Sequence, residues 1–125
     1  MKRKAITAKG SVPVGPYSPG VDTGDYVYVS GQTPLDPETG KLVEGDIAAQ
    51  TKRIFLNLEA ILSAAGLSFD DVVKTTVFLA DMGDFAAMNA EYATHFASPY
   101  PARSTIGVAA LPLGARVEIE LVAKR

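Results

Sequence analysis

The strongest structural pattern in this sequence is helical and runs from Asp46 to about Ala65. Asp46 is a residue type that caps helix N-termini, and apolar side chains then recur every three or four positions, which places them on one helical face. Gly66 followed by Leu67 is typical of a helix that ends in a left-handed residue with a hydrophobic contact after it. An amphipathic helix of this length needs an apolar surface to cover, so the other segments must supply one.

The segments on either side of this helix have the patterns of strands and of one more helix. Asp25–Gly31 alternates apolar and polar side chains, Lys74–Leu79 is rich in β-branched and aromatic residues, and Lys2–Thr7 is compatible with a short edge strand. A second helix is predicted to start between Asp81 and Asp84. The apolar and aromatic residues that share one face of this second helix are Phe85, Met88, Tyr92 and Phe96.

Two further strands are predicted near the C-terminus, at Arg103–Ala109 and Arg116–Leu121, joined as a hairpin by a tight connection at Leu111–Gly114. The order of elements is therefore strands, helix, strand, helix and a two-stranded hairpin. Right-handed crossovers through both helices place them on one face of a single mixed sheet, which predicts an α+β fold. With 125 residues, the chain is expected to be one domain that spans residues 1–125.

Side-chain alternation along the predicted strands separates a helix-facing set from a second face. The helix-facing set is Val27, Val29, Val77, Leu79, Ile106, Val108, Val117, Ile119 and Leu121. The second face would carry Ser30, Phe78, Arg103, Thr105, Glu118, Glu120 and Val122. Two helices cover only one face of a sheet, and this second face is too apolar for an ordinary water-facing surface. We therefore expect self-association to cover it.

The predicted C-terminal hairpin places one arginine, Arg103, beside two carboxylates, Glu118 and Glu120. A guanidinium offers a planar fork of donors that matches a carboxylate or phosphate, whether the anion is a glutamate or a ligand. One interpretation is a cross-strand ion pair on a solvated sheet face. The other is an anion-binding arginine with a carboxylate that handles water or a proton. The strand pattern alone does not choose between the two glutamates.

Composition excludes several classes of chemistry. The net charge is −2 and no long Lys/Arg block is present, so electrostatic capture of nucleic acid is not expected. Because the chain has no cysteine, disulfides, thiolate metal sites and cysteine nucleophiles are excluded. The single histidine, His95, is expected to be a helix-end residue, and no metal site or cofactor is predicted. No signal peptide or long apolar run is evident, which predicts a cytoplasmic protein with no membrane partner.

Several short segments resemble the reactive intermediate deaminase A family, also called RidA or YjgF. They follow one another along nearly the whole chain and are Gly15–Ser18, Val29–Gln32, Ala64–Leu67, Val73–Phe78, the segment around Asn89, Pro101–Ser104 and Val117–Glu120. The resemblance implies a chorismate-mutase-like α+β fold and a homotrimer with clefts between subunits. It also implies hydrolysis of 2-imino acids to 2-keto acids and ammonia without a cofactor, as in a 2-iminobutanoate/2-iminopropanoate deaminase.

The resemblance assigns the two charged roles of the site to particular residues. The carboxylate anchor of the family falls on Arg103, and its water-handling acid falls on Glu118 and not on Glu120. In the chemistry that this implies, Arg103 fixes the substrate carboxylate, and Glu118 orients and deprotonates the attacking water.

The resemblance also assigns the uncharged residues of the site. The lid tyrosine falls on Tyr17 and the polar helix residue on Asn89, both in the catalytic set, and short-range contacts to the substrate fall on Ser30, Gly31 and Thr105. Many family members have a cysteine where this chain has Thr105. The resemblance implies that this residue acts through its main chain, so the change of side chain is expected to matter little.

Two other functions would use the same residues. A single-strand endoribonuclease would bind phosphate through Arg103 and use Glu118 as a base, but the acidic balance and the lack of a basic, aromatic-lined path argue against it. A non-catalytic trimer would bind small carboxylates in the same pocket. Turnover of an imine, measured beside RNA cleavage, separates the three functions.

Overall fold

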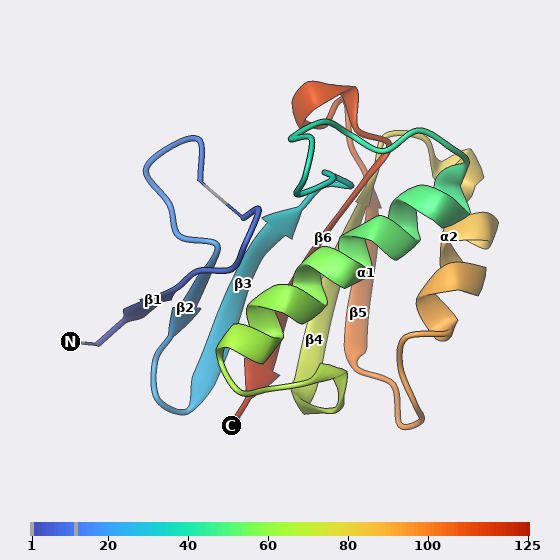
Figure 1. Cartoon of the computed structure of the whole chain (residues 1–125). Helices are drawn as coiled ribbons and strands as arrows, with labels where there is room; N and C mark the ends of the chain where they lie inside the picture. Colours follow the sequence, from blue (N-terminus) through green and yellow to red (C-terminus); the bar gives the residue numbers. More distant parts are fainter. Residues whose placement is uncertain (1, 12) are drawn as a thin grey trace.

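The computed structural model describes residues 2–11 and 13–125, and Met1 and Val12 lie outside the described residues. Within this part of the chain, six strands form one mixed sheet in the order β1-β2-β3-β6-β4-β5 (Figure 1). In chain order the main elements are β1 (Lys4–Ile6), β2 (Gly20–Asp22), β3 (Tyr26–Gln32), α1 (Ile47–Ala64), β4 (Val72–Leu79), α2 (Phe85–Ala93), β5 (Ala102–Gly107) and β6 (Val117–Lys124).

Both helices lie on one face of the sheet. Figure 1 shows α1 crossing the sheet diagonally, with α2 beside it on the side of β5. The largest fully buried side chains come from both layers and include Phe55, Ile54, Leu58, Val77, Leu79 and Ile119. The predicted α+β fold, with two helices on one face of a mixed sheet, is confirmed. Neither helix of the described residues has the length and apolar character needed to cross a membrane.

The ends of α1 form as the sequence predicts. The Asp46 carboxylate accepts a hydrogen bond of 2.9 Å from the backbone N–H of Ala49, which satisfies one of the free donors at the helix start. At the other end Gly66 has a φ of +76°, and the N–H of Leu67 donates to the carbonyl of Leu62 at 2.9 Å. This is the left-handed helix stop that the Gly66–Leu67 pair indicates.

The predicted C-terminal hairpin is wrong. β6 pairs antiparallel with both β3 and β4, whereas β5 pairs in parallel with β4 and lies at the edge of the sheet. The unit β4–α2–β5 is the helical crossover that a parallel strand pair requires. The chain does turn at Pro112–Gly114, but it then enters the sheet on the far side of β4. A turn signal specifies where the chain reverses and not which strand it pairs with afterwards.

The predicted faces of β5 are also wrong. In the parallel register Arg103 lies beside Thr75 and Thr105 beside Val77, and both of these β4 residues are fully buried beneath the helices. Arg103 and Thr105 therefore belong to the helix-facing side, while Ile106 lies on the opposite side and is 46% exposed. Alternation identifies residues that share a face, but on an edge strand only partly covered by a short helix it does not identify the buried face.

The second face of the sheet has no helix over it in the described part of the chain. Tyr28, which is 50% exposed, and Ile106 lie on this face together with the glutamates of β6. Val108, which was predicted to face the helices, follows the end of β5 and is not part of the buried core. The mixture of apolar and charged side chains predicted for the second face is therefore present, with different residues contributed by β5.

Candidate functional site

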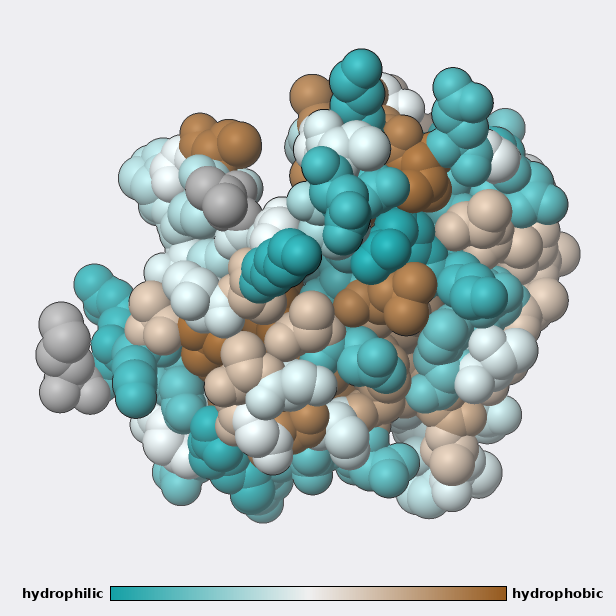
Figure 2. All heavy atoms as spheres, viewed as in Figure 1, coloured by the Kyte–Doolittle hydropathy of each residue, from teal (hydrophilic) through white to brown (hydrophobic). Residues whose placement is uncertain are grey.

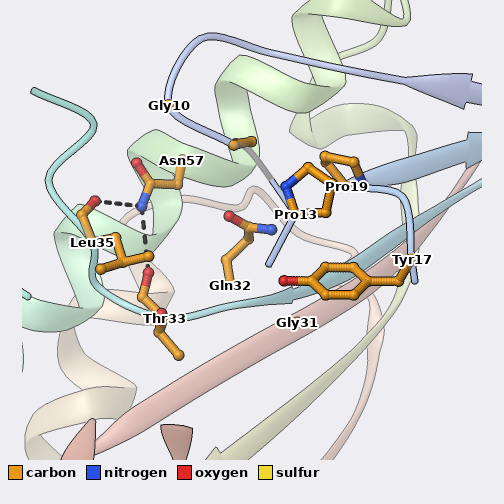
Figure 3. Close-up of a pocket in the computed structure, with 10 residues that line it drawn as sticks. Gly10, Pro13, Tyr17, Pro19, Gly31, Gln32, Thr33, Leu35 and Asn57 are labelled. Atoms are coloured by element: carbon orange, nitrogen blue, oxygen red, sulfur yellow. Dashed lines mark hydrogen bonds between the residues drawn. The ribbon is translucent and has the colours of Figure 1, made fainter. Parts of the chain in front are cut away.

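A proline-rich loop between β1 and β2 forms one wall of the candidate site. In the space-filling view this loop projects from the rest of the molecule, with a notch beside it (Figure 2). Tyr17 on the loop is 50% exposed and borders a small pocket together with Gly31 and Gln32 from the end of β3 (Figure 3). The pocket has a volume of about 70 Å³. A space of this size holds only a few water molecules or a small polar group.

Asn57 of α1 supports the other wall of this pocket. Its amide donates to the backbone oxygens of Thr33 and Leu35, at 3.3 and 2.8 Å (Figure 3). The side-chain oxygen of Asn57 accepts from Arg53. These bonds fix the segment that follows β3 and hence the position of the pocket wall. Asn57 was not among the residues predicted for the site, although an amide beside the apolar face of α1 was the signal available.

Ser30 ties the loop to β3. Its hydroxyl donates to the carbonyl of Ser18 at 2.6 Å, and its backbone N–H donates to the carbonyl of Pro19 at 2.9 Å. The hydroxyl proton of Ser30 is therefore used within the chain, and its oxygen keeps lone pairs that a ligand donor could reach. In this structure Ser30 acts first as the residue that sets the distance between Tyr17 and the sheet.

Glu118 lies on β6, beside Phe78 of β4 and directly against Gly31. A Cβ atom added to Gly31 would lie 2.5 Å from Oε2 of Glu118, so any larger residue at position 31 would displace this carboxylate. Partial burial raises the pKa of Glu118 above its ordinary value, and repulsion from Glu120 raises it further. A carboxylate with a raised pKa is a stronger base than an exposed one, which suits a group that accepts a proton from water.

Arg103 lies on the other side of the sheet, beneath α2. Its guanidinium carbon is 4.7 Å from the centre of the Tyr92 ring and 5.7 Å from that of Phe85. Among the described residues it forms no ion pair, so the cross-strand pair with Glu118 or Glu120 is wrong. Tyr92 and Phe85 were predicted only as members of the apolar face of α2. Their contact with Arg103 was not predicted, because the sequence pattern assigned the wrong face of β5 to the helices.

An open hollow adjoins Arg103. It has a volume of about 700 Å³ and is bordered by Asn89 and small residues of α2, and by Tyr100 and Pro101 ahead of β5. Asn89 and Arg103 therefore face the same space, as the predicted site requires. Thr105 follows on the same side of β5, and its hydroxyl is buried and has no hydrogen-bond partner among the described residues.

The predicted site residues form two groups within one chain. The arginine half-site consists of Arg103, Thr105 and Asn89. The glutamate half-site consists of Tyr17, Ser30, Gly31 and Glu118. From strand spacing and register, the Cα atoms of Arg103 and Glu118 are on the order of 14 Å apart. Their side chains also leave opposite faces of the sheet, so one small substrate does not contact both within a single chain.

His95 does not belong to either half-site. Its ring stacks on Phe55 with the ring centres 4.1 Å apart, and its Nε2 lies 2.7 Å from a carboxylate oxygen of Glu91, one helical turn earlier. These contacts fasten the end of α2 to α1. The prediction that His95 is a helix-end residue is confirmed.

Comparisons with known proteins agree with the architecture described above. The sequence profile of the endoribonuclease L-PSP family matches residues 7–125. A mouse protein named 2-iminobutanoate/2-iminopropanoate deaminase is 50% identical over 122 residues, which cover 97% of this chain and 90% of that protein. These matches extend over nearly the whole chain.

Solved structures agree equally well with the fold. The structure of RidA from an Antarctic Psychrobacter bacterium has a TM-score of 0.93 and 46% identity, and the match covers 98% of this chain and all of that one. The Escherichia coli protein TdcF, solved with bound serine, has a TM-score of 0.91 and 42% identity over 98% of both chains. The chain therefore belongs to the RidA/YjgF family, whose sequence profile has the description endoribonuclease L-PSP.

Proposed function

We propose that this protein hydrolyses 2-imino acids to 2-keto acids and ammonia, and that its active form is a homotrimer with each site built from two copies of the chain. The observation that carries the proposal is Arg103, an arginine beside an open hollow that has no carboxylate partner in the described chain. Such a guanidinium is suited to bind the carboxylate of a ligand with two parallel hydrogen bonds.

Two relatives support this choice of substrate. The mouse relative is named a 2-iminobutanoate/2-iminopropanoate deaminase, and the Escherichia coli relative was solved with bound serine, a small molecule with an α-carboxylate. A 2-imino acid carries the same carboxylate next to an electrophilic carbon. The proposal treats residues 1–125 as one RidA-like domain.

Oligomerisation follows from the separation of the two half-sites. The arginine half-site and the glutamate half-site lie on opposite faces of one sheet, so a substrate held by Arg103 needs the Glu118 of another copy. The second face of the sheet also carries exposed apolar side chains, including Tyr28 and Ile106, which association would bury. In a closed cyclic assembly, each interface between two copies would hold one complete site.

The reaction then proceeds by water addition and loss of ammonia. Arg103 holds the carboxylate, and Asn89 and Thr105 contact the reacting end of the substrate. Glu118 takes a proton from water as the water oxygen bonds to C2. The C=N bond becomes a C–N single bond, and Glu118 passes that proton to the nitrogen. Glu118 next takes the proton of the new hydroxyl and passes it to nitrogen. Glu118 is then a carboxylate again, the C=O bond forms, the C–N bond breaks and ammonia leaves.

Mixing two inactive variants tests this proposal. We expect Arg103→Ala and Glu118→Gln to be inactive separately, with 2-iminobutanoate supplied by an amino acid oxidase and 2-oxobutanoate measured as product. After the two are unfolded and refolded together, an Arg103 from one copy and a Glu118 from another would meet at roughly one quarter of the interfaces of random trimers. Activity should recover to about that fraction. No recovery, although light scattering shows mixed trimers, would contradict a site shared between copies.

The same samples distinguish the alternative functions. Cleavage of single-stranded RNA without imine turnover would favour the endoribonuclease that the family description names. Binding of 2-oxobutanoate by the wild-type protein without turnover would favour a non-catalytic carboxylate-binding protein. A stable monomer at micromolar concentration would contradict the shared site.

A further inference from the structure

The guanidinium of Arg103 rests on two aromatic rings of α2. The ring centres of Tyr92 and Phe85 lie 4.7 and 5.7 Å from its Cζ atom. A cation over a ring face is attracted by the negative charge density of that face, and this contact uses none of the N–H donors at the edge of the guanidinium plane. The rings therefore support Arg103 and leave its donors free.

The Tyr92 ring is itself fixed at its far end. Tyr92 is only 5% exposed, and its hydroxyl lies 2.7 Å from the hydroxyl of Thr75 in a buried hydrogen bond. Thr75 is fully buried on β4 and is the register neighbour of Arg103 on β5. The tyrosine is thus anchored at one end by the backbone of α2. At the other end it is anchored by β4, the strand next to that of Arg103.

We propose that Tyr92 and Thr75 are positioning residues, which hold the Arg103 guanidinium in the orientation that receives the substrate carboxylate. The identity of that ligand rests on the function proposed above. A phenylalanine at position 92 would offer the same ring face without the anchor, so the hydroxyl pair has a role that packing alone does not require. An arginine without a carboxylate partner has many rotamers, and a fixed ring beneath it reduces the orientations that binding must select.

Two variants remove the same hydrogen bond from opposite ends. Tyr92→Phe and Thr75→Val keep the shape of each side chain and delete one hydroxyl. Each is expected to raise the Kd for 2-oxobutanoate, measured by calorimetry, roughly 3- to 10-fold, the range that a displaced cation–π contact would give. If both act through one bond, the double variant should bind no more weakly than either single variant. Thr51→Val is a matched control, because Thr51 is a fully buried threonine whose hydroxyl has no partner.

A second background tests whether the effect passes through Arg103. An ammonium group has no plane to orient, so Thr75→Val should have little further effect on 2-oxobutanoate binding in an Arg103→Lys protein. An equal loss in both backgrounds would overturn the proposal, because the hydroxyl pair would then act on the fold or the ligand directly.

A measurement without ligand separates this proposal from the proposed function. The Nε–H proton of Arg103 in a proton–nitrogen NMR spectrum should be shifted by the ring current of Tyr92, and Thr75→Val should move it towards the value of a free arginine. If this shift changes while wild-type protein binds no 2-oxobutanoate, the positioning role stands and the proposed function fails. If the resonance is the same in wild type and variant, the positioning role is refuted whatever the activity.

Discussion

The contact between Gly31 and Glu118 gives the sharpest test of the glutamate half-site. Gly31 lies in β3 outside the left-handed region, so alanine is compatible with its backbone. An added Cβ would, however, lie 2.5 Å from Oε2 and 2.8 Å from Cδ of Glu118. Ordinary contacts begin near 3.4 Å, so the carboxylate must move by about 0.9 Å. The Gly31→Ala variant therefore displaces the carboxylate that we propose as the base and leaves its charge in place.

The expected loss is large in activity and small in stability. A misplacement of about 1 Å costs on the order of 100-fold in rate when geometry is critical, which equals about 2.7 kcal/mol of transition-state stabilisation. The free energy of unfolding should change little. Replacing glycine at a compatible backbone position stabilises by about 0.4–1 kcal/mol, and an off-rotamer glutamate costs a similar amount. We expect kcat for 2-iminobutanoate to fall about 100-fold while the melting temperature stays near that of the wild type.

Two controls show whether Glu118 carries the effect. Gly107→Ala makes the same substitution in β5, where the new Cβ would meet the flexible and exposed side chain of Met82. It should leave imine turnover largely intact. In a Glu118→Gln background the further loss caused by Gly31→Ala should be small, because the proposed base is already absent. Near-normal turnover of Gly31→Ala alone would refute the reasoning, since the position of the carboxylate would then not matter.

Four further predictions follow from the charged residues. Glu118→Gln should abolish turnover while 2-oxobutanoate still binds, and Glu120→Gln should be much milder; damage from Glu120→Gln instead would mean that the roles are reversed. Burial raises the pKa of Glu118 in the folded protein, so its ionised form destabilises the fold once the pH exceeds the pKa of the unfolded state. Glu118→Gln should therefore raise the melting temperature at neutral pH but leave it unchanged at about pH 4. Arg103→Lys keeps the charge but loses the planar fork, so turnover should fall nearly as far as in Arg103→Ala with melting preserved; near-normal turnover would refute the carboxylate clamp. The hydrogen bond from Arg125 lowers the pKa of Asp22, so Asp22→Asn should lower the melting temperature at neutral pH, and the difference should vanish as acid protonates Asp22 in the wild type.

Local features of the fold were predictable because each is encoded by neighbouring residues. Asp46 and Gly66 mark the ends of α1 by their own capping chemistry, and the alternation in β3 needs only seven residues to be visible. The pairing of the strands was less predictable. β6 pairs with β3 and β4 and not with β5, and this depends on contacts between segments far apart in the sequence. The Leu111–Gly114 turn indicated a hairpin, and only the position of β4 between the two strands excludes it.

The candidate site was predicted as a set of residues and not as an arrangement. The family resemblance selected Arg103 and Glu118, while the strand pattern placed them on one face of adjacent strands. They in fact lie on opposite faces, two strands apart. The contact between Gly31 and Glu118 was also not predicted, because the sequence does not show how β3 is aligned with β6. Spatial register between segments far apart in the sequence is the missing information in both cases.

Neither half-site pairs its charged group with an opposite charge in the described chain. Elsewhere the chain does form such a pair, since Arg116 donates to the carboxylate of Asp84 at 2.8 Å. Arg103 rests on ring faces, and the partial burial of Glu118 disfavours its ionised form. A partly desolvated charge without an opposite charge costs stability, and Arg103 and Glu118 both carry this cost. The fold instead places uncharged groups beside each, two rings next to Arg103 and a glycine next to Glu118, which leaves both available to the ligand that we propose to bind between copies of the chain.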